Sequence, residues 1–207
     1  MKGLINPDSK LHYYVSMGID CFLMNMLFIL TCVPLFSIGA SMIALSRVTM
    51  GMVQGNLSFP IKTYLIEWKK NFVRGTLIQL LLMIVGTILF LAIRFLFFLP
   101  VVSFVIMGTG ILLASISFII VSIYIFQYTA RYDNRFWNSL KVVYQIAVDN
   151  PKETAGMLIT LLTVLAMMSL SPLWGIMISF FYFFVGFALT SLFLSYRTLR
   201  VFTQYEG

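Results

Sequence analysis

The sequence predicts an all-α protein, a bundle of about six transmembrane helices arranged as three hairpins. The first observation is composition: 60% of the 207 residues are hydrophobic and only 10% are charged, whereas a soluble domain carries roughly 25% charged residues. The second is that several apolar runs are long enough to cross the hydrocarbon core of a bilayer, which is about 30 Å thick. The third is that prolines and short polar segments divide these runs into pairs. So little polar surface suits only a protein surrounded by lipid.

The first hairpin is expected over residues 11–53. Its first arm ends near Pro34, because a proline disfavours helical geometry in the residue before it. Ser37 is expected to cap the second arm. Four small side chains share one helical face there and let two helices approach closely in lipid: Ser37, Ala40, Ser41 and Ala44. From Ser37 to Val53 the second arm rises only about 25 Å, so an alternative with five spans leaves 37–53 short of crossing.

Two further units follow, each an amphipathic surface helix and then a membrane hairpin. The surface helices place apolar residues at helical spacing, so we expect them to lie on the cytoplasmic face of the membrane. The expected segments are the surface helix 60–74, the hairpin 76–126, the surface helix 134–149, the hairpin 151–195 and the short C-terminal tail 196–207. Each surface helix leads through a glycine, Gly75 or Gly156, into its hairpin, which indicates a loose internal repeat within one membrane domain.

Two start signals mark the helices of the last hairpin. The first is Asn150-Pro151-Lys152-Glu153, in which asparagine is a preferred N-cap and proline a preferred first helical residue. Glu153 is placed to reach back to the N-cap backbone and complete a capping box. The second is Ser171-Pro172, which is expected to turn the chain into a last span that ends near Ser195.

The distribution of charge predicts the orientation. The net charge is +7, from 14 Lys and Arg against 7 Asp and Glu. Six spans place both termini on the side that holds the loops 54–75 and 127–154, where most of the basic residues then lie. Basic residues collect in the cytoplasmic loops of membrane proteins. We therefore expect both termini in the cytoplasm, with the lipid bilayer rather than nucleic acid as the partner of this charge.

Signatures of catalysis are missing from the sequence. His12 is the single histidine, so a zinc site with two histidines is excluded. The glycine patterns that hold nucleotide phosphates are not present either. We therefore expect no enzyme activity, no cofactor and no metal.

Three polar residues inside the first hairpin form a candidate cluster in the membrane: Asp20, Asn25 and Arg47. Ionisable residues in spans usually face the bundle interior, where they pair or line a pathway. The depths of Asp20 and Arg47 differ by roughly 7 Å, and a long arginine side chain or Asn25 is expected to bridge that gap. A structural pair, or two charges that reach separately to the interface, is the simpler interpretation, and a transport role is the alternative.

Three segments of the chain carry a family resemblance. They are VPLFSIGA at 33–40 followed by Ala44-Leu45, KKNF at 69–72, and FQYTARYD at 126–133 followed by Trp137 and Leu140-Lys141. Together they resemble the YesL-like family of small bacterial membrane proteins, a family of unknown function. Ser37 stands where the family usually has threonine, and Gln127-Tyr128 stands where Pro-Leu is common.

The resemblance implies a multi-pass protein of the bacterial inner membrane. Members of the family are often encoded beside genes for carbohydrate ABC transporters and polysaccharide degradation, so the resemblance implies a role near sugar uptake. The polar residues of the two cytoplasmic segments are candidates for docking a partner or contacting lipid: Lys69, Lys70, Asn71, Arg131 and Asp133.

Two functions remain open on the sequence, and the biochemical activity is unknown. The first is a non-enzymatic accessory or scaffold component for carbohydrate uptake, with ABC-transporter permease components or a second copy of the chain as partner. The second is a small-solute transporter or channel that uses Asp20 and Arg47. The sequence shows no helix broken in mid-span, which argues against a secondary transporter.

Overall fold

The computed structural model describes residues 10–56, 59–98, 100–133 and 136–205, and all regular structure in these ranges is helical. The elements are α1 (Lys10–Cys32), the 3₁₀ turn η1 (Leu35–Ser37), α2 (Ile38–Gln54), α3 (Pro60–Lys70), α4 (Phe72–Leu96), α5 (Val101–Arg131), α6 (Phe136–Asp149), α7 (Pro151–Leu170), α8 (Pro172–Phe181), the π-helix η2 (Tyr182–Gly186) and α9 (Phe187–Tyr205). The predicted all-α membrane bundle is confirmed.

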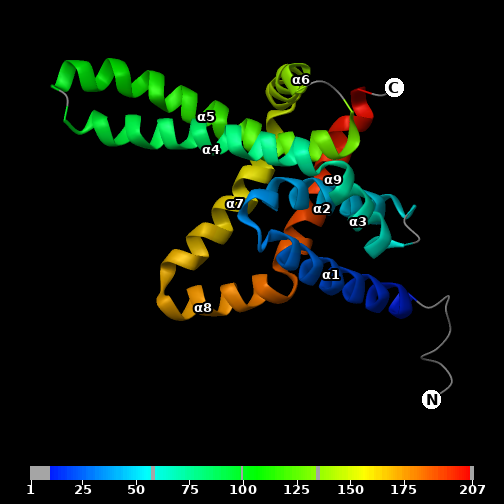
Figure 1. The fold of residues 1–207 in the computed structure, drawn as a ribbon. Coiled ribbons are helices and arrows are strands. Elements are labelled where there is room, and N and C mark those ends of the chain that lie inside the picture. Colours follow the sequence, from blue (N-terminus) through cyan, green and yellow to red (C-terminus); the bar gives the residue numbers. More distant parts are fainter. Residues whose placement is uncertain (1–9, 57–58, 99, 134–135, 206–207) are drawn as a thin grey trace.

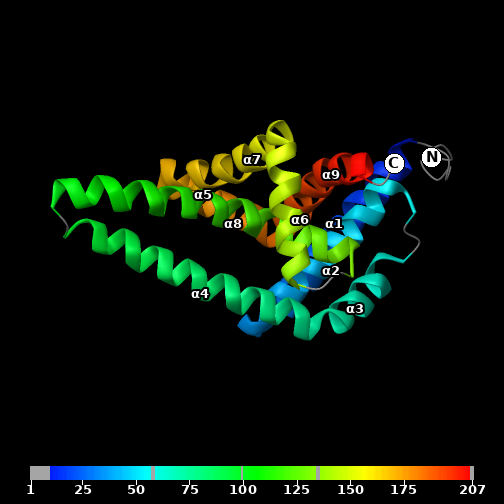
Figure 2. The ribbon, with the colours of Figure 1, turned by 90° about the horizontal axis from the view of Figure 1, so that it is seen from above.

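The helices form one packed centre with two projecting arms. The hairpin α4–α5 extends far to the left of Figure 1, and α7 and α8 form a second arm below it, while α1, α2, α3 and α9 gather on the right. Seen from above in Figure 2, the turns of both arms still point to the left. The start of α1, the end of α9 and α3 lie at the opposite end in both views.

Five helical segments of the described chain are long and apolar enough to cross a membrane. They are Leu35–Gln54, Phe72–Leu96, Ser103–Arg131, Pro151–Ser169 and Pro172–Tyr205. The arm expected to be marginal, 37–53, is among them, because η1 extends the apolar segment at its start to 20 residues, about 30 Å. The shorter apolar segment is instead Ser16–Cys32 in α1, and the sixth expected span depends on it.

Helix α2 is the centre of the bundle. In the apolar segment Leu35–Gln54 that contains it, 61% of the most apolar stretch is buried inside the protein. Its small residues allow another helix to approach very closely, and that helix is α4. A Cβ atom placed on Gly75 would lie 2.5 Å from the backbone nitrogen of Ala40, and one on Gly39 would lie 2.1 Å from the carbonyl oxygen of Gly75. Only glycine at both positions lets these two backbones touch.

The prediction that the Ser37 side chain caps α2 is wrong. The Ser37 side chain caps no helical N–H and instead donates to the carbonyl oxygens of Thr31 and Pro34. Ser37 lies in the 3₁₀ turn, where its hydroxyl is close to the free carbonyls at the end of α1. The start of α2 is satisfied from α4, because Gln79 Oε1 accepts from the Gly39 backbone N–H at 2.6 Å and Gln79 Nε2 donates to the Leu35 carbonyl at 2.9 Å.

The capping box predicted at 150–153 is also wrong, although α7 does begin at Pro151. Asn150 is the only residue between α6 and α7, and its amide donates back to the Ile146 carbonyl and to the Tyr205 hydroxyl. Glu153 pairs with Arg197 of α9 at 2.9 Å. A tertiary partner therefore replaces the bond expected of Glu153, and the Asn150 side chain bonds the end of α6 and Tyr205 instead of capping α7.

The helix that contains the last expected span continues past Ser195, and the predicted tail is helical through Tyr205. No glycine or proline occurs between Phe187 and Tyr205 to stop the helix. Its final turns are held by packing, since Phe202 is buried and meets the rings of Tyr128 and Tyr132 edge-on.

The two surface helices differ in what they cover. In α3, Tyr64 is fully buried and its hydroxyl lies 2.6 Å from Thr31 Oγ1, while Trp68 Nε1 donates to Ser41 Oγ at 3.2 Å. These aromatic side chains thus contact the first hairpin. In α6, Val143 and Ile146 are buried, whereas Trp137 is 71% exposed.

Candidate functional site

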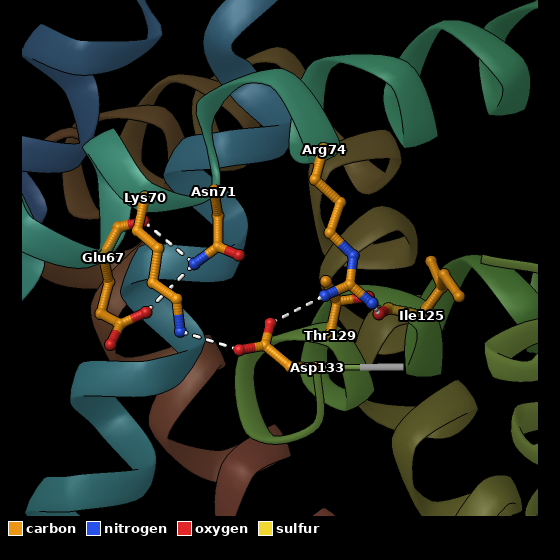
Figure 3. Close-up of polar contacts among 7 residues, drawn as sticks. All are labelled: Glu67, Lys70, Asn71, Arg74, Ile125, Thr129 and Asp133. Carbon is orange, nitrogen blue, oxygen red and sulfur yellow. Dashed lines mark hydrogen bonds and ion pairs between the residues drawn. The ribbon is translucent and has the colours of Figure 1, made fainter. Parts of the chain in front are cut away.

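Polar side chains from several helices meet in a small cleft at the junction of α3, α4 and the end of α5 (Figure 3). Its volume is about 50 Å³. The charged and amide side chains that line it are Arg47 of α2, Glu67 and Lys70 of α3, Asn71 at the α3–α4 junction, Arg131 at the end of α5, and Asp133 just beyond it. We call this set the Asp133 cleft.

Asp133 connects the helices on either side of this cleft. Lys70 Nζ lies 2.9 Å from Asp133 Oδ2, and Arg74 Nη1 lies 3.1 Å from Asp133 Oδ1, so each carboxylate oxygen takes one cation. The hydrogen bond and charge of Lys70 hold the pKa of Asp133 below its usual value, and Asp133 raises the pKa of Lys70. Both side chains are more than half exposed, and an exposed pair of this kind contributes less than about 1 kcal/mol to stability.

Asn71 sets the position of the two cations. It is the single residue between α3 and α4, and its buried amide donates to the Glu67 carbonyl at 3.1 Å and to Glu67 Oε2 at 3.0 Å. Lys70 is the last residue of α3 and Arg74 lies in the first turn of α4, so the junction turns both side chains toward Asp133. Buried polar groups need such partners, and Asn71 therefore fixes this junction.

The cleft carries an excess of positive charge. Arg47, Lys70 and Arg131 line it, and Arg74 joins them through Asp133, against the two carboxylates of Glu67 and Asp133. Such an arrangement can hold an anionic group or an acidic partner surface. The hydroxyl of Thr129 in its wall donates to its own helix, at the Ile125 carbonyl. Across the described residues, no three His, Cys, Asp or Glu side chains gather as metal ligands would.

Four of the five predicted docking residues come together in this cleft: Lys70, Asn71, Arg131 and Asp133. The fifth, Lys69, is exposed next to them. Sequence reasoning missed Arg74, although its spacing of four residues from Lys70 places both on neighbouring turns. It also missed Glu67, whose role depends on the bend at Asn71.

The candidate cluster in the membrane is not formed as predicted. Among the described residues, no hydrogen bond or ion pair joins Asp20, Asn25 and Arg47. Arg47 is exposed and lines the Asp133 cleft. The side of α2 that carries it faces α3 and α5, which leaves the predicted coupling to Asp20 without a contact.

Asn25 instead binds the π-helix η2. Its Nδ2 donates to the carbonyls of Tyr182 at 3.0 Å and Phe183 at 2.7 Å, and its Oδ1 accepts from the backbone N–H of Ala188 at 3.0 Å. A π-helix leaves backbone groups without their α-helical partners, and lipid offers no water to satisfy them. Asn25 supplies these bonds and joins α1 to the last span.

Fold and composition together define an integral membrane protein built as a helical bundle, with a cationic cleft at one end. Residues 21–93 match the profile of a family described as protein of unknown function, DUF624. The matched region holds Arg47, Lys70 and Arg74 and ends before Asp133. No curated protein and no solved structure matches the chain.

Proposed function

We propose that this protein is a non-enzymatic accessory or scaffold component of the bacterial inner membrane, associated with carbohydrate uptake. The observation that carries the proposal is the Asp133 cleft, which gathers cations from α2, α3, α4 and α5 at one end of the molecule. The link to carbohydrate uptake comes from the resemblance of 69–72 and 126–133 to the YesL-like family, since both segments contribute to this cleft.

The exposed face of α6 supports a docking role. Trp137, Tyr144 and Val148 are 71%, 48% and 56% exposed, and Lys141 lies exposed between them on the same side of the helix. Aromatic side chains bordered by cations are typical anchors of protein interfaces. Helix α6 begins at Phe136, shortly after Asp133 in the chain, and we propose that the Asp133 cleft and this face of α6 together dock a permease partner in the cytoplasm.

The alternative, a small-solute transporter or channel, has less support. It needs Asp20 and Arg47 as a polar site between helices. The Asn25 side-chain amide is already hydrogen-bonded to the backbone at the π-helix, and Arg47 faces the Asp133 cleft. Asp20 remains in α1 without the Arg47 contact that motivated this alternative.

The proposal places the Asp133 cleft and both termini in the cytoplasm. Two single-cysteine variants, Asn56→Cys and Phe98→Cys, test this in a background with Cys21 and Cys32 replaced by alanine. An impermeant thiol reagent applied to intact cells is expected to label Phe98→Cys, and to label Asn56→Cys only after the membrane is opened. The reverse pattern would overturn the orientation.

Partner docking is tested by a photo-crosslinking amino acid at position 137, with position 98 at the far end of the α4–α5 arm as matched control. Crosslinked complexes are purified from native membranes and identified by mass spectrometry. We expect a carbohydrate ABC-transporter permease to be captured from position 137 and not from position 98. Capture of the chain's own second copy alone, or the same products from both positions, would contradict the proposal.

A further inference from the structure

A second and much larger cavity lies between α1, α2, α5, α7 and α9. Its volume is about 450 Å³, within the range of sites that hold small molecules. Its walls are mostly apolar and include Phe28, Leu45, Ile119 and Leu165. All these side chains belong to apolar helices of the bundle, whose surroundings in a membrane are hydrocarbon.

Two polar side chains in the wall of this cavity lack a bond that they are able to make. Gln127 is 3% exposed; its Oε1 accepts from Ser195 Oγ at 3.2 Å, and its Nε2 has no partner among the described residues. Ser46 is 4% exposed, and its hydroxyl has no partner there either. In the described part of the chain, Arg197 Nε is the only fully enclosed side-chain nitrogen or oxygen without a bond. The free groups of Gln127 and Ser46 therefore open onto the cavity.

The free donors of Gln127 and Ser46 suit a ligand that carries a hydrogen-bond acceptor on an apolar body. An amide N–H or hydroxyl that faces hydrocarbon without a partner is costly, because lipid tails supply no acceptor. The ester carbonyl of a glycerophospholipid is such an acceptor, and its acyl chain matches the apolar walls. Hydrocarbon alone would fill the volume and leave both donors unsatisfied.

The depth of the two donors matches a lipid ester. Gln127 precedes Arg131 by one turn of α5, about 6 Å along the helix, and Ser46 directly precedes Arg47 on α2. Arg131 and Arg47 both line the cationic Asp133 cleft. From Gln127 the cavity continues along α5 to Phe118, about 13 Å toward the turn of the arm. A phosphate near the two arginines would place its ester at Gln127 and its chain in the cavity.

We propose that the cavity binds one acyl chain of an anionic glycerophospholipid, whose ester carbonyl accepts from Gln127 Nε2 and Ser46 Oγ and whose phosphate lies toward Arg47 and Arg131. The bound lipid fills the space between α5 and α7 and completes the packing of the two arms against α2. The acyl-chain part of this site, at Gln127 and Ser46, is separate from the docking surface proposed above, whereas the phosphate shares Arg47 and Arg131 with the Asp133 cleft.

The test uses the full-length protein in vesicles that contain a phosphatidylglycerol with a diazirine near the ester end of one acyl chain. After illumination, labelled peptides are mapped by mass spectrometry. We expect labelling to concentrate on the cavity-lining turns of α5 and α7. Gln127→Leu and Ser46→Ala are each expected to lower this labelling severalfold, whereas the matched controls Gln204→Leu and Ser179→Ala, at exposed positions outside the cavity, leave it unchanged.

Competition separates this site from ordinary lipid contact. Unlabelled phosphatidylglycerol is expected to displace the probe severalfold better than phosphatidylcholine, and Arg47→Gln with Arg131→Gln should remove that preference. Thermal unfolding in detergent identifies any variant that fails to fold. If Gln127→Leu does not fold, the labelling of Ser46→Ala, which is the smaller change, tests the proposal. Labelling spread evenly over all lipid-facing helices, labelling that survives both donor substitutions, or a second copy crosslinked in the cavity would each overturn the proposal.

Discussion

The two units that follow the first hairpin share a plan and differ in how they are attached. In the unit α3–α4–α5, a Cβ on Gly75 would meet the backbone of α2, 2.5 Å from the Ala40 nitrogen. In the unit that begins with α6 and α7, a Cβ on Gly156 would meet a side chain, 2.1 Å from Nη1 of Arg197. The first unit is thus attached to α2 by direct backbone contact. The second contacts the side chain of Arg197, which is able to shift.

The surface helices repeat this difference. Helix α3 buries Tyr64 and ties Trp68 to α2, whereas α6 leaves Trp137 facing outward. The same sequence plan therefore serves two purposes. Buried aromatic side chains make α3 part of the bundle, and exposed ones keep α6 available for contact with lipid or a partner.

The largest effect is expected at the two glycines. Gly75→Ala should lower stability by roughly 3 kcal/mol, because the new methyl group meets rigid backbone and forces α2 and α4 apart. Gly156→Ala should be nearly neutral, since Arg197 can shift and its partly exposed pair with Glu153 is worth about 1 kcal/mol at most.

Thermal unfolding in detergent measures both variants, with Gly108→Ala as control because a Cβ there meets nothing within 4 Å. Equal losses at Gly75 and Gly156 would break the comparison between the two units.

A smaller effect is expected at the tryptophans of the surface helices. Trp68→Phe removes the indole N–H that bonds Ser41 and should cost about 1 kcal/mol, whereas Trp137→Phe should change stability by no more than about 0.5 kcal/mol. With Trp174 also replaced by phenylalanine, single-tryptophan proteins allow a second measurement. Lipids brominated near the headgroup should quench Trp137 more strongly than Trp68. Equal quenching would mean that α3 is no more enclosed than α6.

The smallest effect is expected at the ion pairs that join α3 and α4 to the end of α5. At neutral pH, Asp133→Asn should lower stability by less than about 1 kcal/mol, because the pairs are exposed. Since Lys70 and Arg74 lower the pKa of Asp133 in the folded protein, this contribution is present above pH 3.8. It is lost as the pH falls through the lowered pKa. Unfolding curves of the two proteins should converge in acid and in high salt. A difference that persists there would indicate a contact other than charge.

The site was only partly predictable from sequence, and the reason is visible in Arg47 and Asp133. Lys70, Asn71, Arg131 and Asp133 are polar residues of the two segments that resemble the YesL-like family, and the structure brings these segments together in one cleft. The residues that surround Arg47 depend on which side of α2 faces α3. Helical spacing places Arg47 on the wheel and says nothing of which helix lies against it.

The sequence by itself determined the solvent of this protein and the helix boundaries that lie at prolines. Composition requires lipid, and Pro34, Pro100, Pro151 and Pro172 act on their own neighbours in the chain, so their effect survives any arrangement of the helices. Only the tertiary structure decided the hydrogen-bond partners. Contact between Gly39 and Gly75 brings Gln79 to the start of α2, where it takes the place expected of Ser37. A partner of this kind is set by close packing between distant segments, which local sequence rules do not encode.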